Sequence, residues 1–259
     1  MKQFTGVLRH EFTMSIHRPV LWIAFGLVFA FYGIAFFSPG PDGTYEIITR
    51  DAIWYHAGND LFMFNMFTAL LSGILASDRM QRDTRLHVRE LQESAPLSRP
   101  AYVLSKYMGV LLSVCLPVLV WVTLYSLISA ALGIVPLAFL PAALLAYFAV
   151  AFPSQAFVVA FSLACPLFMP VRVYQILFTG YWFWGNYLTP QAFPTISDTI
   201  LSACGRYPLE GFFKVTPAIN TTPDTTPLQA VLNLTLLAVL AGLALLAAER
   251  KFTRQARCA

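Results

Sequence analysis

An almost uncharged stretch restricts the fold of this chain more than any other feature of its sequence. Between Lys106 and Asp198, only Arg172 carries a charge. Over the whole chain 58% of residues are hydrophobic and 12% are charged, whereas a soluble domain carries about 25% charged residues. A stretch with one charge cannot form a water-facing surface. The composition therefore predicts an all-α integral membrane protein, whose helices satisfy their own backbone hydrogen bonds in lipid.

Six apolar segments have lengths suited to helices that cross a bilayer. The second and third flank a charged block at 78–106, and the last follows a proline-rich segment at 189–227. Pro141, Pro153 and Pro166 lie within the fourth, which we therefore expect to be tilted and broken. The predicted transmembrane spans are 20–38, 61–77, 107–132, 137–169, 173–188 and 228–248.

The lysines and arginines orient this six-span arrangement. Of the seventeen, only Arg50, Arg206 and Lys214 lie in segments on the side opposite to the termini. Lysine and arginine collect on the cytoplasmic side of membrane proteins. We therefore expect a multi-pass protein of the plasma or inner membrane with both termini in the cytoplasm. The segment after the fifth span is then extracellular, and we expect in it a short helix capped near Ser197 or Asp198.

Residues 1–19 have the pattern of an amphipathic helix. Apolar residues recur at helical spacing from Phe4 to Ile16, and most of the charged side chains lie around the other face. Such a helix lies in the interface plane of a membrane, and Pro19 ends it. We expect an interfacial helix that leads into the first span.

The charged block at 78–106 contains a pattern typical of a short helix. Asp83 or Thr84 can cap its start and Pro96 stops it, after which Ser98 can cap the helix of the third span. Held between two spans, such a helix can fit a groove on a soluble partner and transmit its movement. A solvated loop that only sets the topology explains the same charges. The residues of the expected helix that would meet a partner are Arg85, Leu86, Arg89, Glu90, Leu91 and Glu93.

Several kinds of chemistry are absent from the sequence. None of the four lysines follows a glycine, so there is no phosphate-binding P-loop, and any ATP must be bound by another polypeptide. Neither a His-Glu-x-x-His nor a Gly-x-Ser-x-Gly motif occurs. The four cysteines lack metal-ligand spacing, and topogenic residues at the membrane edges explain the net charge of +4 without nucleic-acid binding. We expect no cofactor, no metal and no catalytic residue in this chain.

The charged block also carries a resemblance. It contains Asp78-Arg79, then Glu90-Leu91, then the run Ser94-Ala95-Pro96-Leu97-Ser98-Arg99, followed by Tyr102 and Lys106. This order is similar to the segment between spans two and three of ABC-2 type transporter permeases, the transmembrane subunits of bacterial ABC exporters. Where that family usually has Gly-Thr before its coupling helix, this chain has Asp83-Thr84.

The N-terminal segment extends the resemblance. Leu8-Arg9-His10-Glu11-Phe12 with Arg18-Pro19 resembles the elbow helix that precedes the first span in the same family. The resemblance implies six transmembrane helices, an N-terminal interfacial elbow helix and a cytoplasmic coupling helix between spans two and three. Within the elbow helix it points to Arg9, Glu11 and Phe12.

The resemblance further implies a permease subunit that performs no catalysis itself. Its partners would be ABC ATPase subunits, which bind ATP and magnesium, and a second permease, either a copy of this chain or a homologue. Closure of the ATPase on ATP would push the coupling helix, at about residues 84–94, and the elbow helix. The spans would then shift between inward-facing and outward-facing arrangements. Permeases of this kind mostly export lipids, glycans, peptides or drugs.

Polar residues within the apolar spans are candidates for a translocation pathway, because an unpaired amide is costly in lipid and must face protein or a cavity. Hydrogen bonding between helices is the simpler explanation of any one of them. Aromatic residues crowd the fifth span, where they suit either an amphiphilic substrate or anchoring at the membrane interface. The candidate pathway residues are Asn65, Gln155, Gln175, Tyr181, Asn186 and Asn233.

Two other classes of function are compatible with a chain of this composition. A non-transporting membrane anchor or assembly protein would tolerate neutralised charges in the block at 78–106, whereas a coupled permease would not. A lipid-modifying membrane enzyme would need ionisable residues that converge near one membrane face. The four histidines are scattered over flanks and loops, which disfavours the enzyme.

Overall fold

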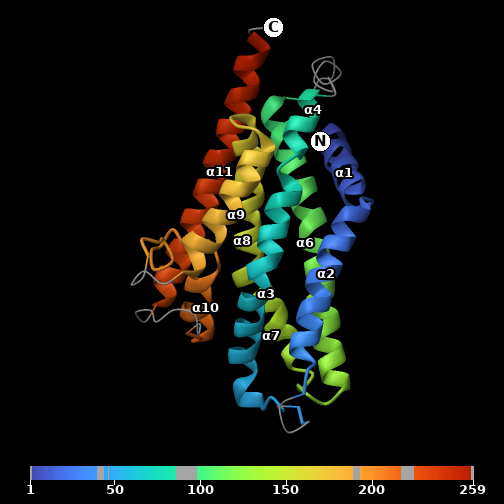
Figure 1. Ribbon diagram of the computed structural model, residues 1–259, viewed down its shortest axis with the longest axis vertical. Coiled ribbons are helices and arrows are strands. Elements are labelled where there is room, and N and C mark those ends of the chain that lie inside the picture. Colours follow the sequence, from blue (N-terminus) through green and yellow to red (C-terminus); the bar gives the residue numbers. More distant parts are fainter. Residues whose placement is uncertain are drawn as a thin grey trace.

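The structure is a computed structural model, and it describes residues 2–39, 44–45, 47–85, 98–188, 193–216 and 225–257. Within these ranges the chain forms helices and connecting loops without a β-strand. The long helices run side by side along one axis of the molecule (Figure 1). The all-α class expected from the composition is confirmed.

Five helices in the described part of the chain are long and apolar enough to cross a membrane. Length and composition together make the chain a multi-pass membrane protein. The five candidate spans are Pro19–Phe36, Arg50–Asp83, Arg99–Ala131, Phe139–Leu167 and Pro227–Lys251.

The first two helices are α1 (Lys2–Ile16) and α2 (Pro19–Phe36). Pro19 occupies the first turn of α2, where a backbone amide would have no helical partner anyway. α1 packs closely against α6 (Arg99–Ala131). At Gly109 of α6, a Cβ atom would lie 2.8 Å from the carbonyl oxygen of Leu8. The absence of a side chain at this position therefore allows the two backbones to approach each other.

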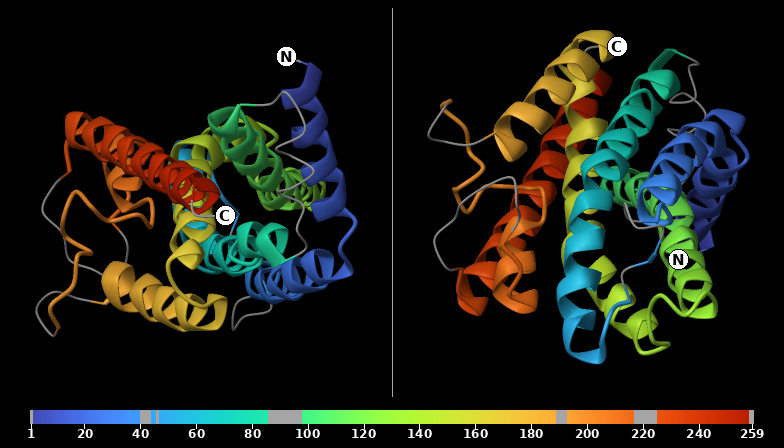
Figure 2. Two further views of the ribbon diagram at one scale, coloured as in Figure 1. Left: turned by 90° about the horizontal axis from the view of Figure 1, so that it is seen from above. Right: turned by 60° about the horizontal axis from the view of Figure 1, so that its bottom comes forward.

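α3 (Ile53–Ala76) follows a short 3-10 turn, η1 (Arg50–Ala52), and occupies a central position in the bundle (Figure 2). The helix begins well before the predicted second span. His56 and Asp60 therefore belong to the helix rather than to an outer loop. Because they are four residues apart, they share one face, and residues between them such as Ala57 pack into the interior.

The charged block begins with a helix, but not the one that was predicted. α4 (Arg79–Arg85) runs through Asp83, so the prediction that Asp83 caps a helix start is wrong. α6 starts directly after Ser98, as expected, although the Ser98 side chain makes no capping hydrogen bond. The helix then continues through Pro117 to Ala131.

The predicted break in the fourth span is present. α7 (Phe139–Ala146) leads through a π-helical turn, η2 (Tyr147–Ala151), into α8 (Phe152–Ala164), which ends in a 3-10 turn, η3 (Cys165–Leu167). Pro153 has no amide proton to donate to the preceding turn, which favours a locally wider helix.

The remaining long helices are α9 (Val171–Tyr187) and α11 (Pro227–Arg257). α9 has 17 residues, which span about 25 Å at 1.5 Å per residue. This is shorter than the roughly 30 Å of a bilayer core. α9 is for this reason not among the five long candidate spans.

A short helix, α10 (Arg206–Phe213), does form in the segment between α9 and α11. It begins after Gly205, whose φ of 89° lies in the left-handed region that glycine adopts readily. The prediction of a cap near Ser197 or Asp198 is therefore wrong. Those two residues instead accept hydrogen bonds from the side chain of Arg206.

The bundle has two distinct ends (Figure 1). α1 begins and α11 finishes at the end that carries α4, which we call the α4 end. The opposite end, the α7 end, carries α7 and the start of α3. Seen from above, α1 lies beside α6 on one flank, and α9 and α11 lie on the other (Figure 2).

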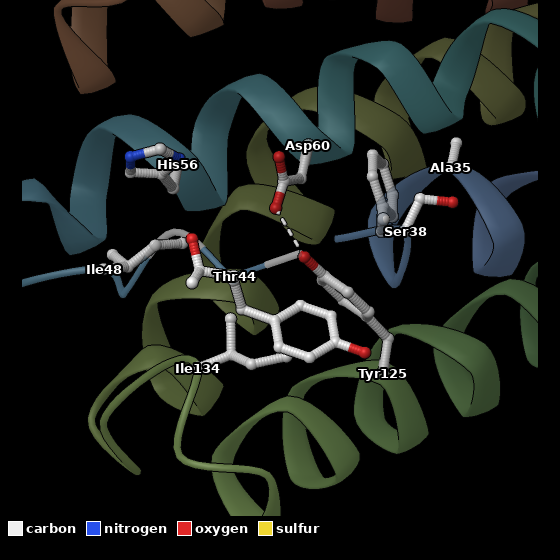
Figure 3. A pocket seen from close by; sticks show the side chains of 10 residues that line it. Ala35, Ser38, Thr44, Ile48, His56, Asp60, Tyr125 and Ile134 are labelled. Atoms are coloured by element: carbon white, nitrogen blue, oxygen red, sulfur yellow. Dashed lines mark hydrogen bonds between the residues drawn. The ribbon is translucent and has the colours of Figure 1, made fainter. Parts of the chain in front are cut away.

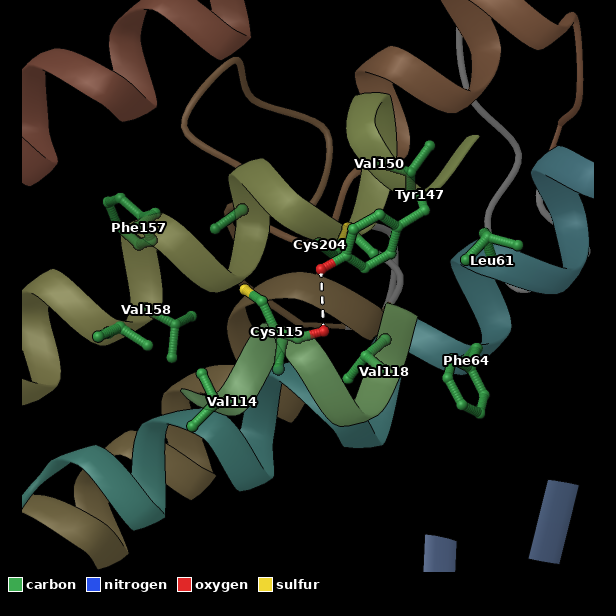
Figure 4. Packing of buried hydrophobic residues seen from close by; sticks show 14 of the residues in the cluster. Leu61, Phe64, Val114, Cys115, Val118, Tyr147, Val150, Phe157, Val158 and Cys204 are labelled. Carbon is green, nitrogen blue, oxygen red and sulfur yellow. Dashed lines mark hydrogen bonds between the residues drawn. The ribbon is translucent and has the colours of Figure 1, made fainter. Parts of the chain in front are cut away.

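The outer helices present apolar side chains to the surroundings, and the interior is tightly packed. Ile23, Leu27 and Phe31 of α2 are all exposed. Such a surface suits contact with lipid rather than with water. Inside, the Tyr147 hydroxyl donates a hydrogen bond to the carbonyl oxygen of Cys115 at 3.2 Å, among buried residues of α3, α6 and α8 (Figure 4).

Candidate functional site

A buried ionic junction joins three helices at the α4 end. Lys106 of α6 is fully buried, and its Nζ donates to Oε1 of Glu11 on α1 at 2.8 Å. The same Nζ forms an ion pair with Oδ2 of Asp83 on α4. The Tyr102 hydroxyl, one turn before Lys106 on α6, donates to that carboxylate oxygen as well. We call Glu11, Asp83, Tyr102 and Lys106 the ionic junction.

The junction makes its three helices depend on one another. A charge buried without a partner is strongly destabilising, because it has lost its water and gained nothing in return. Lys106 therefore requires both carboxylates, and each carboxylate requires Lys106. Gly109, one turn further along α6, permits the close approach of α1 that brings Glu11 within reach.

A polar pocket opens at the α7 end, between α2, α3 and α6 (Figure 3). Its volume is about 450 Å³. Ile48 donates a backbone hydrogen bond to the Ile134 carbonyl oxygen at 2.9 Å, which ties the loop before α3 to the loop after α6. The residues lining the pocket are Ala35, Phe36, Ser38, Thr44, Tyr45, Ile48, His56, Asp60, Tyr125 and Ile134.

Asp60 is the acidic group among the described residues that line this pocket. The Tyr125 hydroxyl of α6 donates to its Oδ2 at 2.8 Å. Asp60 is 9% exposed, and His56 lies one helical turn away on the same wall (Figure 3). A carboxylate, an imidazole and hydroxyl groups that line a cavity can bind a cation or an amine-bearing solute.

Three of the predicted pathway residues form hydrogen bonds to other elements of the fold. Asn65 donates to the carbonyl oxygen of Cys204 at 2.9 Å, and Gln175 donates to Ser77 Oγ at 3.0 Å. The Gln155 side chain accepts a hydrogen bond from the Cys115 thiol at 3.0 Å. Each of these amides therefore joins separate elements in the interior.

The other three predicted pathway residues lie on α9 and α11. The Asn186 side-chain oxygen accepts a hydrogen bond from the Ala203 amide at 2.9 Å. Asn233 donates to the carbonyl oxygen of Ser202 at 3.0 Å, so the two asparagines hold the segment before α10. Tyr181 is 37% exposed and lines an apolar cavity of about 350 Å³ between α8 and α9. The six candidates thus do not line one common cavity.

The segment around α10 contains a second buried charge network. Arg206 is 2% exposed and donates from Nη1 to Asp198 Oδ1 at 2.5 Å. Its Nε donates to Glu210 Oε1 at 3.3 Å. The Thr225 hydroxyl, just before α11, donates to the other oxygen of Glu210. These contacts fold the segment into a compact cap on α3 and α11.

The residues expected to contact a partner are placed only in part. Arg85 ends α4, and the other five, Leu86, Arg89, Glu90, Leu91 and Glu93, lie outside the described residues. In the expected elbow helix, Arg9 is exposed, Phe12 is half-buried and Glu11 is buried in the ionic junction.

Sequence reasoning missed the chemistry of Asp60, Lys106, Tyr125 and Arg206. The sequence alone places Asp60 in an outer segment before the second span and Lys106 at the end of the charged block. The spacing of Tyr102 and Lys106 was an available signal, because residues four apart share a helix face. The pairing of Asp60 with Tyr125 left no such signal, because its partners are 65 positions apart in the chain.

Comparison of the chain with protein-family models, with curated proteins and with solved structures finds no match.

Proposed function

We propose that this chain is the membrane-spanning permease subunit of an ATP-driven exporter of the ABC-2 type. The observation that carries the proposal is the ionic junction. It joins the start of the charged block to α1 and α6, through buried ion pairs instead of a flexible loop. A partner that pushes on residues 84–94 would therefore move α6 and α1 together with α4.

In this proposal the chain crosses the membrane six times, with α9 as the short fifth crossing. Both termini lie at the α4 end of the bundle (Figure 1), and an odd number of crossings would separate them. The excess of lysine and arginine makes the α4 end cytoplasmic. The chain then belongs in the plasma or inner membrane, with the polar pocket on the extracellular side.

The two ends of α3 and α6 suggest how movement would reach the pathway. Asp83 lies on α4, which follows α3 closely in the chain, and it pairs with Lys106 of α6 at the α4 end. At the α7 end, Asp60 of α3 accepts a hydrogen bond from Tyr125 of α6. A shift of α6 against α3 would therefore act directly on the hydrogen bond inside the polar pocket. Separate ABC ATPase subunits would supply ATP and magnesium, and a second permease would complete the pathway.

The proposal is tested by reconstitution in lipid nanodiscs with a candidate ABC ATPase. The informative variant removes all three charges, as Glu11→Gln, Asp83→Asn and Lys106→Met together. It leaves none of the three junction positions with a buried charge that has lost its partner, so we expect it to fold and to bind the ATPase. We expect loss of the increase in ATP hydrolysis that the wild-type chain confers.

The matched control is Arg250→Gln, which removes an exposed charge from α11 at the same end. It should keep the full stimulation of ATP hydrolysis. If the triple variant stimulates the ATPase like wild type, the junction does not couple the two proteins. If neither the wild type nor the Glu90→Arg/Leu91→Asp variant differs from an empty nanodisc across candidate ATPases, the chain is better explained as a membrane anchor.

A further inference from the structure

A second, smaller cavity lies at the α4 end, next to the ionic junction. Its volume is about 130 Å³. The start of α2, the region where α3 passes into α4, and α6 enclose it. Two arginines and one serine line it together with apolar side chains; the lining residues are Arg18, Val20, Leu21, Leu75, Arg79, Val110, Ser113 and Val114. We call it the arginine cavity.

The two arginines of this cavity have unused hydrogen-bond donors. Arg79 is only 4% exposed, and its Nε and Nη1 atoms are buried without a hydrogen-bond partner in the described part of the chain. Nη2 of Arg18 is also buried and has no hydrogen-bond partner in the described part of the chain. Buried guanidinium groups are nearly always paired, since each missing hydrogen bond destabilises the fold. These donors therefore call for an acceptor that the described chain does not supply.

The charges around the cavity favour an anion. Burial is the main cause that lowers the pKa of the Arg18 guanidinium, and repulsion from the nearby Arg82 lowers it further. The carboxylates of Asp78 and Glu11 raise that pKa. Glu11 is already bound to Lys106, and no ion pair joins it to Arg79 among the described contacts. Among the described contacts, neither Asp78 nor Glu11 forms an ion pair with Arg18 or Arg79, so the unpaired guanidinium donors remain available to an anion.

The backbone adds to this preference. Arg18 is the N-cap residue of α2, and no side chain caps that helix start. The N-terminus of an 18-residue helix carries a partial positive charge, which favours an anion. Two guanidinium groups and a helix N-terminus together form a surface suited to a tetrahedral oxyanion.

We propose that the arginine cavity binds a phosphate group. The forked donors of Arg79 would hold two of its oxygens, and Arg18 would hold a third. The mouth of the cavity favours a phospholipid headgroup as the source over free phosphate, because Val20 at this mouth is 60% exposed on the apolar face of α2. Acyl chains could then lie along α2 while the phosphate sits between the arginines.

A phosphate at this place would bridge the same helices as the ionic junction. Arg18 lies between α1 and α2, and Arg79 lies three residues after the end of α3 and four before Asp83. The bound phosphate would stabilise the packing of α1, α2, α4 and α6 that the structure shows. This inference does not depend on the exporter proposal, since it concerns lipid or phosphate binding by the chain alone.

The test uses the full chain, purified and stripped of lipid in detergent. Three probes are added separately: dioleoyl phosphatidylglycerol, dioleoylglycerol without a phosphate, and inorganic phosphate. Thermal unfolding and native mass spectrometry report binding. We expect phosphatidylglycerol to raise the Tm and to remain bound, and dioleoylglycerol to do neither.

The key variant is Arg79→Met, which keeps the volume and removes the charge. Without lipid, its Tm should equal or exceed that of wild type, because an unpaired buried charge has been removed. With phosphatidylglycerol, its apparent affinity should fall by about tenfold or more. A purely structural arginine would instead lower the Tm in both conditions, and this result would overturn the proposal. Arg250→Met, on the exposed face of α11, is the matched control and should behave like wild type.

A second variant, Val20→Trp, tests the mouth without touching a charge. Val20 is exposed, so a larger side chain should not disturb the fold. We expect it to weaken phosphatidylglycerol binding. A Tm increase with inorganic phosphate alone, unaffected by Val20→Trp, would identify free phosphate as the source. Equal retention of dioleoylglycerol and phosphatidylglycerol, or unchanged binding in both variants, would exclude a phosphate site.

Discussion

Two carboxylates in different surroundings hold α6 near its two ends, one from α4 and the other from α3. At the α4 end, Asp83 meets a fully buried lysine and a tyrosine hydroxyl, with a second carboxylate on the far side of that lysine. At the α7 end, Asp60 meets one tyrosine hydroxyl at the edge of a cavity of about 450 Å³.

This difference has a mechanical meaning. At the α4 end, separating the helices would leave several buried charges without partners, so the contact behaves as a rigid joint. At the α7 end, water or a cation in the pocket can replace the Tyr125 hydroxyl, so the contact can open at little cost. We therefore expect α6 to move together with α4 at the α4 end and to separate from α3 at the α7 end. The predictions below test this contrast.

The largest effect is expected for Lys106→Met. It leaves Glu11 and Asp83 buried without their cation, and such a loss costs about 3–5 kcal/mol. We expect a large fall in Tm and poor recovery of folded protein, measured by thermal unfolding in detergent. Adding Glu11→Gln and Asp83→Asn should restore most of the loss. A triple variant as unstable as the single one would refute the ionic explanation.

Gly109→Leu should give the next largest effect. The new Cβ would lie 2.8 Å from the Leu8 carbonyl oxygen, and overpacking of this kind costs about 1–3 kcal/mol. α1 should be displaced from α6, and a cysteine pair placed across this contact should cross-link more slowly. Gly242→Leu, where nothing lies within 4 Å of a new Cβ, is the control. Equal cross-linking in both variants would contradict close packing of α1.

A smaller effect is expected for Tyr125→Phe. The variant removes one hydrogen bond to Asp60, but the carboxylate still borders the pocket, so the loss should be about 1 kcal/mol. Unfolding measurements beside an exposed control, Tyr55→Phe, would report it. A loss as large as that of Lys106→Met would remove the contrast between the two ends.

The smallest perturbation is chemical labelling of thiols. It compares the water exposure of the polar pocket with that of the segment around α10. A cysteine in place of exposed Ser38 should react with a water-soluble maleimide at pH 8. Native Cys204 is buried, and this burial raises the pKa of its thiol, so little thiolate forms at that pH. Mass spectrometry should find label at position 38 and not at Cys204. Equal labelling would show that the cap is as open to water as the pocket.

The sequence predicted best what depends on local composition. The apolar segments, the break at Pro153 and the helix start after Ser98 all follow from residues close together in the chain. The sequence alone predicts too late a start for α3, because the polar residues His56 and Asp60 are typical of a loop. These polar side chains line a pocket whose opposite side is formed by α6. No pattern in the sequence near His56 and Asp60 predicts that α6 lies there.

The site was harder to predict, for the same physical reason. Glu11 was expected within the elbow helix, but its partner Lys106 is 95 positions away in the chain. The local pattern predicts Asp83 as a helix cap, because aspartate favours that position. In the structure a buried ion pair decides its role instead. Interactions between distant charged residues therefore set the site, while local apolar patterns set the spans.

The π-helical turn at Tyr147–Ala151 has a consequence for insertions and deletions. A turn of this kind accommodates one more residue than an α-helical turn, and one residue rotates a helix by roughly 100°. Gln155 reaches Cys115 because it lies beyond this turn. Removal of a single residue from the turn would let the helix run on regularly and rotate Gln155 away from Cys115. The orientation of the helix after this turn thus depends on how many residues the turn contains as well as on which residues they are.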